Sequence, residues 1–176
     1  MTKNKQKFSD WLIDYYGVNV RDFNETKVPW FWRQFKHVNG LGVRGKDIYL
    51  RYLSIMSEEP KVRRLLHECK HTSRQKKVGW NWWLVKYAFD SNFRRREEVD
   101  AFTRNMAYRV LKGKDFSSMA EEYTDFIAYN YFPSKRVRRR QELRILKELK
   151  RNLDNIIEGT YTEVKDLHDL WELEQR

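Results

Sequence analysis

The sequence predicts an α+β fold that is mostly helical and includes one small sheet. Most segments after residue 57 place apolar residues at helical spacing, whereas residues 47–55 have the two-residue period of a strand. Hydrophobic residues make up 40% of the 176 residues and aromatic residues 15%, which suffices for a core. We expect a main domain over residues 1–133 and a C-terminal helical extension over residues 134–176, packed on the same domain.

The first expected element is a short helix over residues 8–16. Ser9 or Asp10 can cap this helix at its start, and Gly17 can end it. Residues 30–38 are rich in aromatic side chains and precede a glycine-containing turn, so we favour a strand there over a short helix.

The best strand candidate is the segment 47–55. Its alternation places Ile48 and Leu50 on one face and Tyr49 and Leu53 on the other. Ser57 and two following acids favour a helix start, and this helix would run to about Val78 and end at Gly79.

The remaining chain is predicted to be helical. Residues 80–89 form a strongly apolar helix that is too short to cross a bilayer, and we expect it to be buried. Further helices are expected over about 94–112, 117–131 and 134–158, and Thr162 can cap a last helix. Leu146, Leu149, Leu153 and Ile156 are spaced for a helix docked on the domain.

The composition narrows the classes of protein. The first residues include three lysines and lead into no apolar run, and no apolar stretch reaches ~18 residues, so we expect a cytoplasmic chain without a secretory signal or membrane span. Cys69 is the only cysteine and allows no internal disulfide. The net charge is +11, with fourteen Lys/Arg and five Asp/Glu between residues 61 and 113. That excess suits either a solvated surface or an acidic partner.

A metal-binding pattern lies in the helix predicted to begin near Ser57. His67 and His71 are one turn apart, so both imidazoles can reach one metal ion. Glu68 lies beside them, where its carboxylate can accept a proton from a metal-bound water. His-Glu-x-x-His on a helix is the signature of zinc-dependent peptidases. The alternative is a solvated helix with two unrelated histidines, against which the apolar stripe Val62, Leu65, Leu66 and Cys69 argues.

A catalytic zinc site usually has three protein ligands, so a third must be found. His37 is expected to be a surface or packing residue, and His168, far away near the C-terminus, could occupy the solvent face of the last helix. The acids after the aromatic helix are better candidates: Glu97, Glu98 and Asp100. They could also form ordinary surface ion pairs with the preceding arginines.

The motif, the Trp-rich segment and Glu98-Val99-Asp100-Ala101-Phe102 together resemble the gluzincin metallopeptidases, particularly small single-domain ones, some of them encoded by bacteriophages. The resemblance covers residues 46–113. It implies a zincin-like fold in which a small sheet lies next to the active-site helix, with Zn²⁺ as cofactor and Glu98 as third ligand. Phe102 departs from the family pattern, where many members have an aspartate that supports the first histidine.

The resemblance implies hydrolysis of peptide bonds in a protein or peptide substrate, with Glu68 as general base. An extended peptide could pair with the edge of the strand at 48–55. Candidates for the oxyanion donor are Tyr87, Tyr108, Tyr123 and Tyr129.

Two other functions remain open. Basic runs such as 135–140 and the many aromatic residues suit a nucleic-acid-binding protein. The chain could also be a degenerate peptidase fold that binds metal without cleaving. The sequence leaves the substrate and the oligomeric state undetermined.

Overall fold

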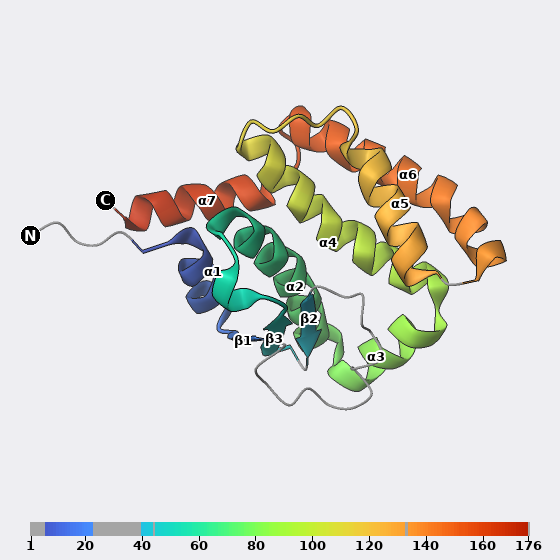
Figure 1. Cartoon of the computed structure of the whole chain (residues 1–176), viewed down its shortest axis with the longest axis horizontal. Coiled ribbons are helices and arrows are strands. Elements are labelled where there is room, and N and C mark those ends of the chain that lie inside the picture. The colour runs from blue at the N-terminus through green and yellow to red at the C-terminus, as the bar shows by residue number, and fades with distance from the viewer. Residues whose placement is uncertain (1–5, 23–39, 44, 133, 176) are drawn as a thin grey trace, which may run out of the picture. The chain divides into compact units, whose positions relative to one another are not determined.

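Helices dominate the computed structural model, which describes residues 6–22, 40–43, 45–132 and 134–175 (Figure 1). One small sheet lies among the first fifty residues, so the predicted α+β class is confirmed. The described chain forms two compact units. The first contains the residues up to Trp80 together with those from His168 onward, and the second contains Asn81–Leu167. The division predicted between residues 133 and 134 stays a prediction.

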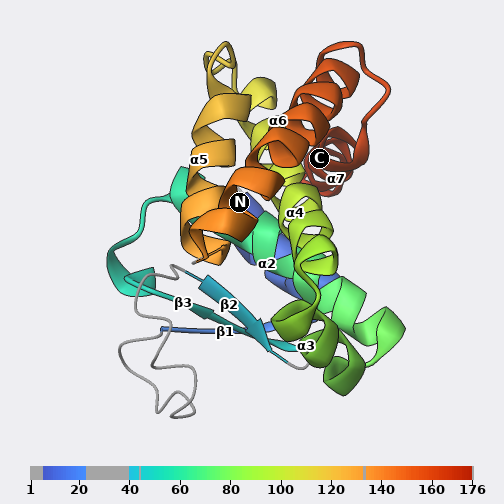
Figure 2. The same cartoon turned by 90° about the vertical axis from the view of Figure 1, so that its right-hand side faces the viewer.

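The sheet of the first unit has three strands in the order β1-β3-β2 (Figure 2). The central strand β3 pairs in parallel with β1 and antiparallel with β2. Because both edges of β3 are occupied, the expectation that a peptide substrate pairs with this strand is wrong. The strands are β1 (Asn19–Asp22), β2 (Gly40–Val43) and β3 (Asp47–Leu50).

The strand predicted over residues 47–55 is shorter than expected. Ile48 and Leu50 are fully buried, as the alternation predicts, but β3 ends at Leu50. Tyr52 has a positive φ of 59°, which no extended strand adopts, and the chain then enters a single 3₁₀ turn over Leu53–Ile55. Ile55 is consequently 80% exposed. The strand expected over residues 30–38, with His37, lies outside the described residues.

Two helices of the first unit pack on each other. These are α1 (Phe8–Tyr16) and α2 (Glu58–Val78), and α2 also lies against β2 and β3. The predicted ends at Gly17 and Gly79 are confirmed, and Gly17 has the left-handed conformation that closes a helix.

The caps predicted for α1 are wrong, whereas Ser57 lies at the N-cap of α2 as predicted. The cap position of α1 is Lys7, and Ser57 caps α2 without a side-chain hydrogen bond. Ser9 instead donates from its backbone N–H and its hydroxyl to the Glu58 carboxylate, at 2.8 and 3.0 Å. Asp10 pairs with Lys61 at 2.8 Å. The side chains expected to cap α1 therefore join α1 to α2.

The last helix, α7 (Glu163–Glu174), begins in the second unit and ends in the first. Its later part packs on α1, where Phe8 contacts the rings of His168 and Trp171. The Trp11 indole also donates to Glu174 at 2.6 Å. His168 is therefore a buried packing residue, and the expectation that it occupies the solvent face of the last helix is wrong.

The second unit is built around three long helices that lie side by side (Figure 2). Their shared core contains Phe102 and Met106 from α4, Met119 and Ile127 from α5, and Leu149 from α6. The docking predicted for α6 is confirmed. The helices of this unit are α3 (Trp80–Phe89), α4 (Ser91–Leu111), α5 (Met119–Tyr131) and α6 (Lys135–Ile157).

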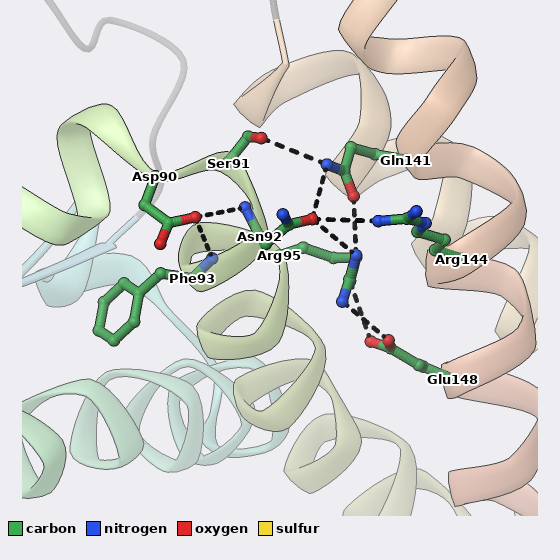
Figure 3. Close-up of polar contacts among 8 residues, drawn as sticks. All are labelled: Asp90, Ser91, Asn92, Phe93, Arg95, Gln141, Arg144 and Glu148. Atoms are coloured by element: carbon green, nitrogen blue, oxygen red, sulfur yellow. Dashed lines mark hydrogen bonds and ion pairs between the residues drawn. The ribbon is translucent and has the colours of Figure 1, made fainter.

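A polar network joins the start of α4 to α6 (Figure 3). Asp90 accepts hydrogen bonds from the backbone N–H groups of Asn92 and Phe93, which explains why α4 begins three residues before the predicted start. The buried Arg95 donates to Gln141 at 3.0 Å and pairs with Glu148 at 3.1 Å. Arg95 is therefore structural.

The aromatic helix α3 is more exposed than the sequence predicts. Only Trp83 is buried, whereas Phe89 is 87% exposed. The expectation of a buried helix is wrong, because α3 is held through one face only. Among the described residues, no helix is long and apolar enough to cross a membrane.

The core of the second unit gives a stability prediction. Leu149→Ala should lower the free energy of unfolding by about 2–5 kcal/mol, because it leaves a cavity between tightly packed helices. The control is Leu143→Ala on the same helix, where the side chain is 76% exposed and the effect should stay within about 0.5 kcal/mol. Urea unfolding measures both variants, and equal losses would contradict this packing.

Candidate metal centre

Helix α2 brings the two histidines of the motif together. Both imidazoles are buried, and their Nε2 atoms lie 3.2 Å apart. Two nitrogen ligands at ~2.0–2.1 Å from a tetrahedral metal would be about 3.3 Å apart. The same separation also suits an N–H···N hydrogen bond in a metal-free chain. His67 and His71 therefore already have the spacing of two ligands of one metal ion.

The apolar stripe predicted before the motif is confirmed. Val62, Leu65, Leu66 and Cys69 are fully buried, and this side of α2 forms part of the core of the first unit. The stripe fixes the rotation of the helix about its axis, and the rotation fixes the direction of His67 and His71.

Glu68, the predicted base, is also buried. One turn earlier, Arg64 interacts electrostatically with Glu68 and donates to the backbone carbonyl of Arg51 at 2.9 Å. Burial lowers the pKa of Arg64, and the neighbouring Arg63 lowers it further. Arg64 therefore ties the segment after β3 to the helix that carries the motif, a role that sequence reasoning missed.

In the second unit, α3 contacts the two glutamates predicted as ligand candidates. The Tyr87 hydroxyl donates to Glu98 Oε1 at 2.5 Å, and the Trp83 indole donates to Glu97 Oε2 at 2.8 Å. The two aromatic rings stack on each other with centroids 4.5 Å apart. Both carboxylates are buried, so they are not the exposed surface ion-pair residues of the alternative interpretation.

Tyr87 is held as a hydrogen-bond donor. Burial raises its pKa well above the ordinary value, and the adjacent Glu98 carboxylate raises it further. The phenol consequently keeps its proton at any physiological pH. Of the four tyrosines considered as oxyanion donors, Tyr87 is thus already engaged with a candidate ligand.

The other three tyrosines have different surroundings. Tyr108 is buried, with the Lys112 ammonium over its ring. Tyr123 packs against Phe102 with ring centroids 5.0 Å apart. Tyr129 is exposed and lies beneath the guanidinium of Arg138. None of these contacts identifies an oxyanion donor, and the assignment stays open.

Arg94 holds the end of α3 against α4 and α5. Its guanidinium donates to the backbone carbonyls of Tyr87, at 2.7 Å, and of Tyr131, at 2.9 Å, and also to Ala88. Because these carbonyls belong to two helices, Arg94 fixes the position of the tyrosine that contacts Glu98.

The remaining ligand candidates have other roles. Asp100 is exposed, and Phe102 belongs to the core between α4 and α5. His168 lies 3.7 Å from Glu172 on α7, in a group whose two acids, Asp169 and Glu172, are exposed. Phe102 therefore cannot support a histidine ligand as the family's aspartate does.

The predicted site residues divide between the two units. His67, Glu68 and His71 belong to the first unit, and Glu98 belongs to the second. Comparison with protein-family models, curated proteins and solved structures gave no match. Function is therefore inferred from the residues of this chain alone.

Sequence reasoning missed Trp83 and Tyr87 as partners of the candidate ligands. The signal available for them is their spacing, since two aromatic residues with polar tips lie one helical turn apart immediately before the acids.

Proposed function

We propose that this chain is a zinc-dependent metallopeptidase similar to the gluzincins. His67, His71 and Glu98 would hold the metal, and Glu68 would act as general base. The observation that carries the proposal is the 3.2 Å separation of the two Nε2 atoms on one helix, with a buried glutamate between the histidines in sequence. A zincin-like fold, in which α2 lies on a small sheet, is part of the proposal.

Two observations favour Glu98 as the third ligand. Asp100 is exposed, whereas the other two acids are buried. Glu97 and Glu98 are successive residues of α4 and project about 100° apart, so one metal ion would use only one of them. Tyr87 donates to Glu98 in the way that outer partners commonly orient ligand carboxylates, whereas the Trp83 indole holds Glu97.

The donor set suits zinc, which binds imidazole nitrogen and carboxylate oxygen. When bound, zinc lowers the pKa of a coordinated water to ~7 and polarises a substrate carbonyl. A Glu68 carboxylate oxygen would accept the proton of the attacking water and deliver it to the departing amine nitrogen. Burial of Glu68 keeps bulk water from competing for that proton.

A second candidate function is metal binding without cleavage. Phe102 occupies the position of the family's supporting aspartate and is committed to the core. His67 would then need another partner for its second ring nitrogen. Measuring cleavage separately from zinc content distinguishes this candidate from the peptidase.

Removal of the metal tests the proposed function. The chain should cleave an unstructured protein such as casein, and a zinc chelator should abolish cleavage. Adding back about one equivalent of zinc should restore it, whereas magnesium should not, since Mg²⁺ prefers an octahedral oxygen site. Cleavage that survives complete removal of the metal would contradict the proposal, and zinc binding without cleavage of any substrate would favour the second candidate.

Tyr87→Phe tests the support of the third ligand. The variant loses only the hydroxyl that donates to Glu98, and zinc affinity should fall about 10–100-fold while the fold is kept. Competition with a chelating dye measures the affinity, and circular dichroism checks the fold. Tyr129→Phe is the control, because that exposed hydroxyl has no partner role in the proposal. Equal affinities of both variants would remove Tyr87 from the site.

A further inference from the structure

The exposed face of α6 carries an unusual concentration of positive charge. Between Lys135 and Arg151, eight Lys/Arg side chains are exposed, and the two acids in this span are half-buried. One of those acids, Glu148, already pairs with Arg95. The basic face is defined by Lys135, Arg136, Arg139, Arg140, Arg144, Lys147, Lys150 and Arg151.

Little of this charge is neutralised within the chain. Lys150 pairs with Glu121, and Arg144 donates to Asn92. In the part of the chain that the structure describes, the other six basic side chains make no ion pair with an acid. Ordinary solvated helices mix charges of both signs, as Glu59 and Arg63 do on α2.

The arrangement opposes the stability of the helix itself. Like charges four residues apart repel each other, and the basic face has four such pairs: Lys135–Arg139, Arg136–Arg140, Arg140–Arg144 and Lys147–Arg151. These exceed the three pairs of opposite charge at the same spacing, Arg138–Glu142, Arg144–Glu148 and Lys150–Asp154. Two of the cations also lie in the first turn, next to the positive end of the helix dipole, and no acid is present there. A polyanion bound along this face would relieve both kinds of repulsion.

We propose that the basic face of α6 binds the phosphate backbone of a nucleic-acid duplex without reading its sequence. From Arg136 to Arg151 the helix rises roughly 22 Å. Over that length each strand of a B-form duplex carries about six phosphates. The charge density of a duplex therefore matches a row of cations that continues for four turns.

The buried face of α6 argues against an anionic membrane as the partner of the basic face. A helix that binds at a membrane surface inserts its apolar side among the lipids. In α6 that side consists of Ile145, Leu149 and Leu153, which are packed in the core of the second unit. The contact with a partner is therefore electrostatic, and it is independent of the proposed peptidase site.

Fluorescence anisotropy with labelled 20-base-pair duplexes of random sequence tests this inference on the full chain. The dissociation constant should rise steeply with salt, with a log–log slope of about −4 or steeper for DNA. The dissociation constants of a DNA duplex and an RNA duplex are compared, and the duplex that binds more tightly identifies the source of the phosphates. The face variant carries R136Q, R139Q, R140Q, K147Q and R151Q.

The face variant should bind at least about a hundredfold more weakly at 100 mM salt, with a slope closer to −1. The control has the same loss of charge at exposed lysines elsewhere: K7Q, K46Q, K77Q, K86Q and K165Q. The affinity of the control variant for the duplex should fall less than about tenfold. Circular dichroism verifies that both variants fold. Equal losses in the two variants, no binding by the natural chain, or tighter binding to vesicles containing phosphatidylserine would each overturn the proposal.

Discussion

Glu68→Gln is expected to leave zinc binding unchanged and to reduce peptide hydrolysis roughly 10²–10⁴-fold. The substitution keeps the size and hydrogen-bonding capacity of the buried side chain but removes the carboxylate that would accept the proton. The histidines on either side keep their positions, because the apolar stripe of α2 sets them. Cleavage rate and zinc content are measured on the same preparation.

Glu59→Gln is the matched control for that experiment. It makes the same chemical change on the same helix, in a surface pair with Arg63 that lies two turns before the motif. Its activity should equal that of the natural chain. If Glu68→Gln retained full activity with zinc bound, Glu68 would not be the general base. A loss of zinc in this variant would indicate a role for Glu68 in holding the metal instead.

Glu98→Ala is expected to abolish stable zinc binding. Two imidazoles alone make a poor zinc site, and removal of the third ligand should weaken affinity by about a hundredfold or more. Activity should disappear with the metal. Glu97→Ala provides the control, since it removes the neighbouring carboxylate that Trp83 holds. That variant should keep about one zinc per chain, as measured by elemental analysis after dialysis.

The comparison of these two variants assigns the third ligand. Loss of zinc in Glu97→Ala and retention in Glu98→Ala would reverse the assignment. Since both carboxylates are buried, thermal unfolding of the metal-free proteins must accompany the measurement. If an alanine variant unfolds without metal, the glutamate at that position is replaced by glutamine instead, which fills the same space.

Local signals predicted the helices of this fold well. The glycines at positions 17 and 79 end helices at the expected residues, because glycine adopts a positive φ at little energetic cost. The strand over 47–55 was wrong in length, since the positive φ of Tyr52 leaves no trace in the alternation pattern. Ser9 does not cap α1, because the helix begins at Phe8 with Lys7 at the cap, and Ser9 instead donates two hydrogen bonds to the distant Glu58.

The burial of individual side chains was harder to predict from the sequence than the positions of the helices. The aromatic segment 80–89 is apolar enough to suggest burial, yet only Trp83 is buried. The Trp83 indole N–H and the Tyr87 hydroxyl donate hydrogen bonds to glutamates 14 and 11 residues further along the chain. Helical periodicity does not predict such contacts between helices. Phe102 departs from the pattern of the gluzincins in sequence, and the structure shows why an apolar residue suits this position. Its ring packs against Tyr123 and Phe126 of α5.

The candidate site itself was predictable to the extent that it depends on one helix. Residues four positions apart share one face of an α-helix, so the helix assignment predicts that His67 and His71 can approach each other, and the structure places their Nε2 atoms 3.2 Å apart. The proposed third ligand belongs to a different helix, so helical periodicity around the motif could not separate the acids 97, 98 and 100. Burial argues only against the exposed Asp100, and the proposed choice of Glu98 over Glu97 rests on the hydrogen bond from Tyr87.

The most direct test of the proposed centre is an anomalous difference map at the zinc edge, from crystals of the natural chain grown with zinc. We expect one strong peak at ~2.0–2.1 Å from Nε2 of both His67 and His71 and at ~2.0–2.2 Å from a Glu98 carboxylate oxygen. A peak held by Glu97 in place of Glu98 would change the ligand assignment. A map with no peak at the two histidines, in a chain folded as described, would contradict the metal centre.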